Sequence, residues 1–170
     1  KFKKKFRYDE NETWFDYGGV GLLFYAACSN EVNVVADLLD ELKRDFQGKE
    51  YSRRLESRIR KEGYVAIGLP GEASALMIAM AVASSEVVSM LLESGANVER
   101  VDVMGNDAFI YASAYGRPKN LQCWLEKVKD WDLSRQNTVV GGCALGNAVY
   151  MGANKLETVQ VLLDAGASLD

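Results

Sequence analysis

Residues 74–97 read Ser-Ala-Leu-Met-Ile-Ala-Met-Ala-Val-Ala-Ser-Ser-Glu-Val-Val-Ser-Met-Leu-Leu-Glu-Ser-Gly-Ala-Asn, and this stretch decides the fold. It begins with small and apolar residues, passes through a Ser-Ser turn into Val-Val and Leu-Leu, and closes on Gly-Ala. A second copy of this sequence pattern runs from Cys143 to Ser168 and also ends with Gly-Ala, at residues 166–167. Because repetition at a regular spacing is typical of stacked supersecondary units, it outranks every other feature of the sequence.

The repeated unit can be located four times by the apolar residue that opens its first half. These residues are Leu23, Leu76, Phe109 and Leu145, and they are separated by 53, 33 and 36 residues. Each unit has room for two short helices joined by a turn. The long first interval indicates an insertion between the first and second units.

The residue types within each unit suit two packed helices. Small residues such as Ala79 and Ala112 allow helices to approach closely. Leucine pairs such as Leu162-Leu163 are predicted to lie on the buried side of the second helix. Gly95 and Gly166 come directly after that helix, where a left-handed backbone ends it without a Cβ clash.

These units resemble the ankyrin repeat. Asp102-Val-Met-Gly105 matches the family's opening turn, Glu86-Val-Val88 its Glu-Val-Val, and Gly95-Ala-Asn-Val98 its closing phrase. Ser74-Ala-Leu-Met77 stands where the family has Thr-Pro-Leu-His, a tetrad that caps and ties the first helix. The resemblance implies an all-α ankyrin-repeat solenoid of about four helix-turn-helix units with one inserted helix. Since the tetrad is degraded, we expect a less stable array than a consensus one.

The resemblance divides the chain into regions. We predict a basic N-terminal extension at 1–13 and an ankyrin-repeat domain at 14–170, with repeats at about 14–46, 70–101, 102–134 and 135–170 and an insertion at 47–69. The sequence stops where another repeat would begin. We therefore expect further repeats or another domain after Asp170.

Positive charge is concentrated in two segments of an otherwise acidic chain, whose net charge is −4. Residues 1–7 are basic, and the insertion is predicted to form an amphipathic helix at about 49–62. One interpretation is that these segments bind an anionic surface, such as an acidic protein, phospholipid headgroups or nucleic acid. The other is that they solvate an exposed helix packed on the solenoid. The basic residues of the predicted helix are Arg53, Arg54, Arg58, Arg60 and Lys61.

The sequence contains no histidine and three widely spaced cysteines. Without histidine there is no Ser-His-Asp or Cys-His nucleophile, no imidazole base and no His-containing zinc site. We predict no enzyme: no catalytic residues, no cofactor, no metal and no small-molecule substrate. An odd number of cysteines without a Cys-x-x-Cys pair favours a reducing, intracellular location, on the cytoplasmic side; no organelle is indicated.

Ankyrin-like proteins bind through hairpin tips and the exposed side of the first helix, and several of those positions here are apolar. The resemblance therefore implies a protein-protein interaction module, an adaptor or structural subunit of an assembly, whose partner is another protein. The alternative function is a cytosolic regulatory domain of a larger channel or enzyme. A competing interpretation of the apolar positions is that degenerate helices rotate them into the core. The predicted protein-binding residues are Val82, Val103, Met104, Asn106, Tyr115, Tyr150 and Met151.

Overall fold

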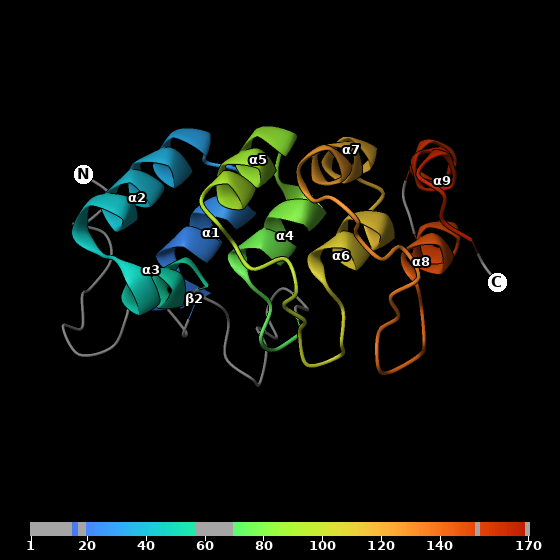
Figure 1. The fold of residues 1–170 in the computed structure, drawn as a ribbon, viewed down its shortest axis with the longest axis horizontal. Coiled ribbons are helices and arrows are strands. Elements are labelled where there is room, and N and C mark those ends of the chain that lie inside the picture. Colours follow the sequence, from blue (N-terminus) through green and yellow to red (C-terminus); the bar gives the residue numbers. More distant parts are fainter. Residues whose placement is uncertain (1–14, 17–19, 57–69, 152–153, 169–170) are drawn as a thin grey trace.

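The computed structural model describes residues 15–16, 20–56, 70–151 and 154–168 and shows two parallel rows of helices (Figure 1). This all-α solenoid confirms the fold class predicted from the sequence. A hairpin of two-residue strands, β1 (Phe15–Asp16) and β2 (Val20–Gly21), precedes the first helix. The inner helices are α1 (Leu22–Cys28), α4 (Ala75–Val82), α6 (Ala108–Ala114) and α8 (Ala144–Met151), and the outer helices are α2 (Val32–Asp45), α5 (Ser85–Glu93), α7 (Pro118–Lys127) and α9 (Lys155–Asp164).

The inner helices are short, with seven or eight residues each. Successive inner helices pack against one another along the solenoid. They consist of small and apolar residues, and none of the four carries a charged side chain. Ala79, Ala112 and Ala148 are fully buried, as close helix approach requires.

The outer helices are amphipathic, because one side of each packs on the inner helices and the other faces solvent. Leu91, Leu121 and Leu162 are fully buried on this packed side. Leu163, which we predicted to be buried beside Leu162, is about half exposed. It lies on α9, the last outer helix of the described residues, so no further described unit covers it.

The degraded tetrad keeps its capping role with different residues. The Ser74 hydroxyl accepts a hydrogen bond from the backbone N–H of Met77 at 3.3 Å, and the Asp107 carboxylate accepts one from Ile110 at 2.8 Å. The corresponding acceptor at α8 is the Cys143 sulfur, 3.4 Å from the Gly146 nitrogen. Each group satisfies an N–H that the first helical turn leaves unpaired. In these units the first helix is therefore capped by groups other than those of the consensus tetrad.

The inserted helix is α3 (Gly48–Leu55), which ends at Leu55 rather than at the predicted residue 62. Leu55 is buried, and the Tyr51 hydroxyl donates to the Ser94 carbonyl at the end of α5, at 2.7 Å. Just after α3, the Glu56 carboxylate accepts from the Asn97 N–H at 2.6 Å and pairs with Arg100 at 3.1 Å. The insertion thus connects the end of the first unit to the end of the second.

The third unit closes on Trp131 rather than on Gly-Ala, and an aromatic cluster explains the difference. The Trp131 ring lies edge-on to the fully buried Trp124 ring, with centroids 4.9 Å apart, and both rings contact Phe109. Such a cluster buries a large apolar area where the other units use the packing of Ala96 or Ala167.

Candidate protein-binding surface

The loop tip between the second and third units is built around buried Asp102. One oxygen of its carboxylate accepts from the backbone N–H groups of Met104 and Asn106, at 2.8 and 2.9 Å. The other accepts from the Asn106 amide at 3.1 Å and from the Tyr111 hydroxyl at 2.9 Å. This carboxylate holds the turn in one shape and attaches it to the inner helix α6.

Neighbouring tips are joined by backbone hydrogen bonds. The Val103 N–H donates to the Gly71 carbonyl, and the Thr138 N–H donates to the Met104 carbonyl, both at 3.0 Å. Gly105 allows this approach, because a Cβ built there would lie 2.6 Å from the Thr138 nitrogen and its φ is +78°. The tips therefore form a connected edge with its backbone groups largely paired.

A row of exposed apolar side chains follows the inner helices. Val82, Tyr115 and Met151 occupy the same position at the end of successive inner helices, and they are 37–63 % exposed. We call these three residues the inner row. Tyr150, beside Met151, is 86 % exposed. The alternative that these residues rotate into the core is therefore wrong.

Tyr115 is the most constrained member of the inner row. Its ring stacks on the ring of buried Tyr111, with centroids 6.3 Å apart and planes at 8°. The Tyr111 hydroxyl is in turn bound to the Asp102 carboxylate. Burial, reinforced by that carboxylate, raises the pKa of Tyr111 and keeps the hydroxyl a donor. One face of the Tyr115 ring thus packs on Tyr111, which restricts the ring and lowers the entropy that binding would cost.

The structure places the other predicted binding residues in two different environments. Val103 and Met104 are exposed at the tip between the second and third units. The Asn106 side chain is already occupied within the chain and does not face a partner freely. It donates to Asp102 and accepts from Asn137 at 3.0 Å. Its role is to join two tips. Sequence reasoning also missed exposed valines at or near the tips, although their position in turns was a usable signal: Val101, Val139 and Val140.

Charged groups near the tips are paired with each other. The Arg135 guanidinium pairs with Glu99, lies 3.3 Å from the Asp107 carboxylate, and covers the Trp131 ring at 4.6 Å. Arg135 is therefore already in contact with Glu99, Asp107 and Trp131. The side chains that the tips present to a partner are mainly apolar. An interface here would depend on apolar contact more than on charge.

The basic residues of α3 are engaged within the insertion. Glu50 binds Arg53 through two hydrogen bonds of 2.9 Å and Arg54 through one of 2.6 Å. These hydrogen bonds lower the pKa of Glu50 to about 2. Arg54 also covers the Phe46 ring at 3.9 Å. These contacts favour a structural role for Arg53 and Arg54. Arg58, Arg60, Lys61 and the basic N-terminal extension at 1–13 lie outside the described residues.

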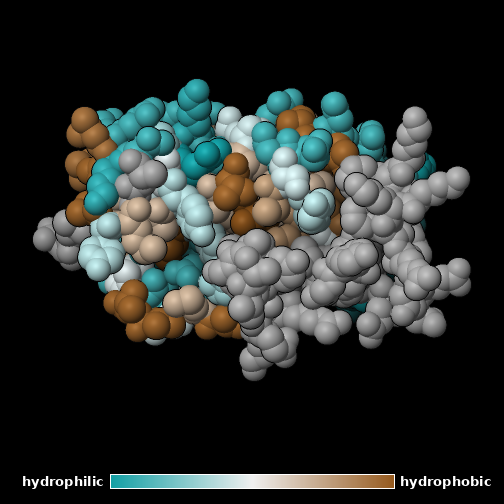
Figure 2. Space-filling view, turned by 180° about the vertical axis from the view of Figure 1, so that it is seen from behind, coloured by the Kyte–Doolittle hydropathy of each residue, from teal (hydrophilic) through white to brown (hydrophobic). Residues whose placement is uncertain are grey.

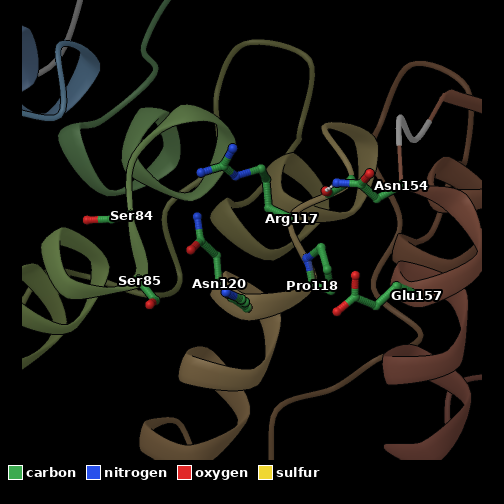
Figure 3. A pocket seen from close by; sticks show the side chains of 9 residues that line it. Ser84, Ser85, Arg117, Pro118, Asn120, Asn154 and Glu157 are labelled. Atoms are coloured by element: carbon green, nitrogen blue, oxygen red, sulfur yellow. Dashed lines mark hydrogen bonds between the residues drawn. The ribbon is translucent and has the colours of Figure 1, made fainter.

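A polar pocket of about 420 Å³ lies where the turns of the second, third and fourth units meet (Figure 3). Its main polar groups hold the units together. Arg117 donates to the Ala83 carbonyl at 2.6 Å, and Asn154 donates to the Gly116 carbonyl at 3.0 Å. Glu157 lines the pocket from α9. The pocket is best explained as the joint between units.

Two further features concern the part of the chain that the structure describes. No group of three or more His, Cys, Asp or Glu side chains there could hold a metal ion. None of the helices there is both long enough and apolar enough to span a bilayer.

Comparison with known proteins agrees with this geometry. Residues 72–103 match the family described as ankyrin repeat. Among solved structures, the chain is similar to the ankyrin repeat domain of Bcl-3, a unique member of the IkappaB protein family, with a TM-score of 0.66 and 24 % identity. The alignment covers 91 % of this chain and 60 % of the Bcl-3 chain, and at this identity it is a similarity of fold. A comparison with curated proteins found no match.

Proposed function

We propose that this chain, which contains an ankyrin repeat and has the fold of an ankyrin-repeat domain, is a non-enzymatic adaptor or structural subunit that binds another protein. Ankyrin repeats are in general protein-protein interaction modules. The binding surface consists of the inner row and the apolar loop tips. The observation that carries the proposal is the recurrence of an exposed apolar side chain at the same position of three successive units.

Exposed apolar side chains gathered on one surface support this assignment. Contiguous apolar patches on a protein surface mark interaction sites more often than scattered exposed residues do. The inner row runs across three units, and Tyr115 at its centre is an aromatic side chain held by Tyr111. Rigid aromatic residues near the centre of a patch are typical of binding hot spots.

The chemistry of the surface indicates what kind of contact it makes. The inner helices carry no charged side chain, and Arg135 at the tips is paired internally. Charge-led association weakens steeply with salt, whereas apolar association does not. We therefore infer a partner that presents apolar side chains, bound with little dependence on ionic strength.

The test compares partner capture by the wild-type chain and by a Tyr115→Ala, Met151→Ala double variant. We expect the double variant to lose at least tenfold in affinity for the captured partner, since truncating hot-spot residues costs about 2 kcal/mol or more each. Leu156→Ala is the matched control, because Leu156 is exposed but lies on the outer helix α9. All three proteins should have the same helical circular dichroism.

Two outcomes would contradict the proposal. Equal capture by the double variant would show that the inner row is not the binding surface. Capture lost in proportion to salt, with both variants unaffected, would assign binding to charged groups instead. A regulatory domain of a larger channel or enzyme would use the same surface, and the complete reading frame distinguishes it from a free adaptor.

A further inference from the structure

The polar pocket between the second, third and fourth units lies next to the inner row. It is lined by the turns that directly follow the three inner-row residues in the sequence. Arg117 connects the two features, because its guanidinium donates to the carbonyl of the inner-row residue Val82 at 3.4 Å. Figure 2, the view from behind, shows mostly hydrophilic residues along the outer helices, at the top, and hydrophobic residues below them. A segment bound along the inner row therefore lies beside a polar pocket.

Arg117 differs from the other arginines of the described residues. It is partly buried and donates through Nη2 to the neutral carbonyls of Val82 and Ala83. Its Nε and Nη1 groups have no acceptor in the described part of the chain. The guanidinium therefore keeps an unpaired charge and several N–H donors. The other described arginines all form ion pairs with Asp or Glu side chains: Arg44, Arg53, Arg54, Arg100 and Arg135.

Other groups around the pocket add positive charge. Lys119 lines it and makes no ion pair with a described residue. The helices α5, α7 and α9 all begin at the pocket, and none of them has a side-chain cap. The inner helices α4 and α6, by contrast, are capped by Ser74 and Asp107. The positive ends of three helix dipoles therefore lie around the same space as Arg117 and Lys119.

Glu157 determines which kind of anion fits the pocket. It lines the wall from α9, so the lining residues carry two positive charges, on Arg117 and Lys119, and one negative charge. A single carboxylate balances the remaining positive charge, whereas Glu157 would repel the second charge of a phosphate dianion. A carboxylate is also the planar acceptor that a guanidinium binds through two parallel hydrogen bonds.

We propose that the pocket receives the carboxylate of an Asp or Glu side chain of the partner protein, next to apolar side chains of that partner on the inner row. This inference rests on the proposed function, because the inner row brings the partner to the pocket. Arg117 binds the carboxylate with the N–H groups that the joint leaves free, and Lys119 adds a second charge at the exposed rim. One recessed ion pair sets the register of the partner, while apolar contact remains the main source of affinity.

Nuclear magnetic resonance titrations of the isotope-labelled chain at constant ionic strength test the proposal. The probes are the blocked peptide acetyl-Leu-Asp-Leu-amide, its Asn counterpart, acetate and inorganic phosphate. We expect the Asp peptide to shift the backbone N–H signals of Ser85 and Lys119. It should bind about tenfold more tightly than the Asn peptide, because hydrogen bonds to a charged acceptor are stronger than those to a neutral one. Acetate should bind more weakly, since it lacks the leucines that contact the inner row.

Two variants locate the binding groups. Lys119→Gln should weaken binding of the Asp peptide about threefold, as expected for an exposed cation, and Arg117→Gln about tenfold. Lys129→Gln is the matched control, because Lys129 is exposed just beyond the end of α7 but does not line the pocket. Circular dichroism should show that the variants are folded. Lys119 makes no contact that joins units, so its variant decides the outcome even where Arg117→Gln is unstable.

The possible results separate this inference from the proposed function. Tyr115→Ala should reduce binding of the Asp peptide to the level of acetate and leave acetate binding unchanged. Equal affinity for the Asp and Asn peptides, or unchanged binding in Lys119→Gln, would overturn the carboxylate site without affecting the capture test of the inner row.

Two further results would overturn the proposal by assigning the pocket to another ligand. Acetate that binds as tightly as the Asp peptide would indicate a free carboxylate rather than a side chain of the partner. Phosphate that binds more tightly than both would indicate a site for a dianion.

Discussion

At the scale of single residues, Asp107 shows how burial and pairing compete at one carboxyl group. It caps α6 through the Ile110 N–H and lies 3.3 Å from the Arg135 guanidinium, and both contacts favour the charged form. Yet only 1 % of the residue is exposed, and desolvation opposes the charge more strongly. The net effect is that burial raises the pKa of Asp107 above its ordinary value of 3.8.

This raised pKa predicts a pH dependence of stability. Between 3.8 and the folded-state pKa, the folded chain binds more protons at Asp107 than the unfolded chain. Its contribution to the free energy of unfolding therefore falls as the pH rises through that window. Asp107→Asn keeps a capping oxygen but cannot ionise. The free energy of unfolding of the variant minus that of the wild type should increase across the window.

Urea unfolding of both proteins at several pH values measures this difference. Taking the difference between the two proteins cancels the opposite contributions of Glu93 and Asp132, whose pKa values are lowered by hydrogen bonds from Lys127 and Ser134. A difference that stays constant, or decreases with pH, would show that pairing with Arg135 outweighs burial.

At the scale of elements, α3 is the feature that sets this solenoid apart from a plain array. It follows α2 directly and reaches the end of α5 through Tyr51 and Glu56. The Tyr51 hydroxyl donates to the Ser94 carbonyl, which is one of the carbonyls that the end of α5 leaves without a helical partner. The insertion therefore acts as a strap between the first two units.

Tyr51→Phe tests the strap. Removing the hydroxyl eliminates the 2.7 Å hydrogen bond to Ser94 and should lower the free energy of unfolding by about 0.5–1.5 kcal/mol. Amide exchange should accelerate in residues 48–56 more than elsewhere. Ser52→Ala is the control, since its hydroxyl bonds only to the Gly48 carbonyl within α3. If both variants exchange alike, the strap is held by the burial of Leu55 rather than by Tyr51.

At the scale of the whole molecule, stability depends on how well each unit is joined to the next. Side chains at the turns make these joints: Asn30 accepts from the Ser84 N–H, and Arg117 and Asn154 donate to carbonyls of the preceding unit. In repeat proteins each unit contacts only its neighbours, so these joints couple the folding of one unit to that of the next.

Asn120 makes the most buried of these joints. Its amide nitrogen donates to the carbonyls of Ala79, Met80 and Ala83, at 3.0–3.3 Å, and the residue is 1 % exposed. Asn120→Ala should lower the free energy of unfolding by about 1–3 kcal/mol, because it leaves buried carbonyls without this donor.

The urea transition of this variant should also broaden, since the second and third units become less coupled. Gln122→Ala, at an exposed position of the same helix, is the control. A loss of stability with an unchanged transition slope would show that Asn120 stabilises the array without coupling its units.

Much of this fold could be read from local patterns. The spacing of Leu76, Phe109 and Leu145 located the inner helices, because each unit must place an apolar residue at the same point of the stack. The exposed positions Val82, Tyr115 and Met151 followed from the same periodicity. The role of Asn106 could not be read in this way, because it depends on Asn137 of the next unit, 31 residues away.

The capping residues show a similar division. Ser74 and Asp107 are good N-cap types that local reasoning can recognise. The expectation of a less stable array came from comparing the sequence with the Thr-Pro-Leu-His consensus, and such a comparison does not show which hydrogen bonds the replacing residues make. The end of α3 was also misjudged, because the local pattern that predicted an amphipathic helix at about 49–62 says nothing about Glu56 binding Asn97 and Arg100.

Periodicity alone thus specified the repeat, its two helices and the apolar positions that recur in it, since these depend on residues a few positions apart. The exposure of each recurring position depended on long-range packing. Leu39 is buried and Leu92 is partly buried, while Leu163, at the same position of the last described unit, is half exposed, although all three lie in similar Leu-Leu pairs. The physical reason is that burial is a property of neighbouring units, and the pattern within one unit cannot say whether a neighbour covers it.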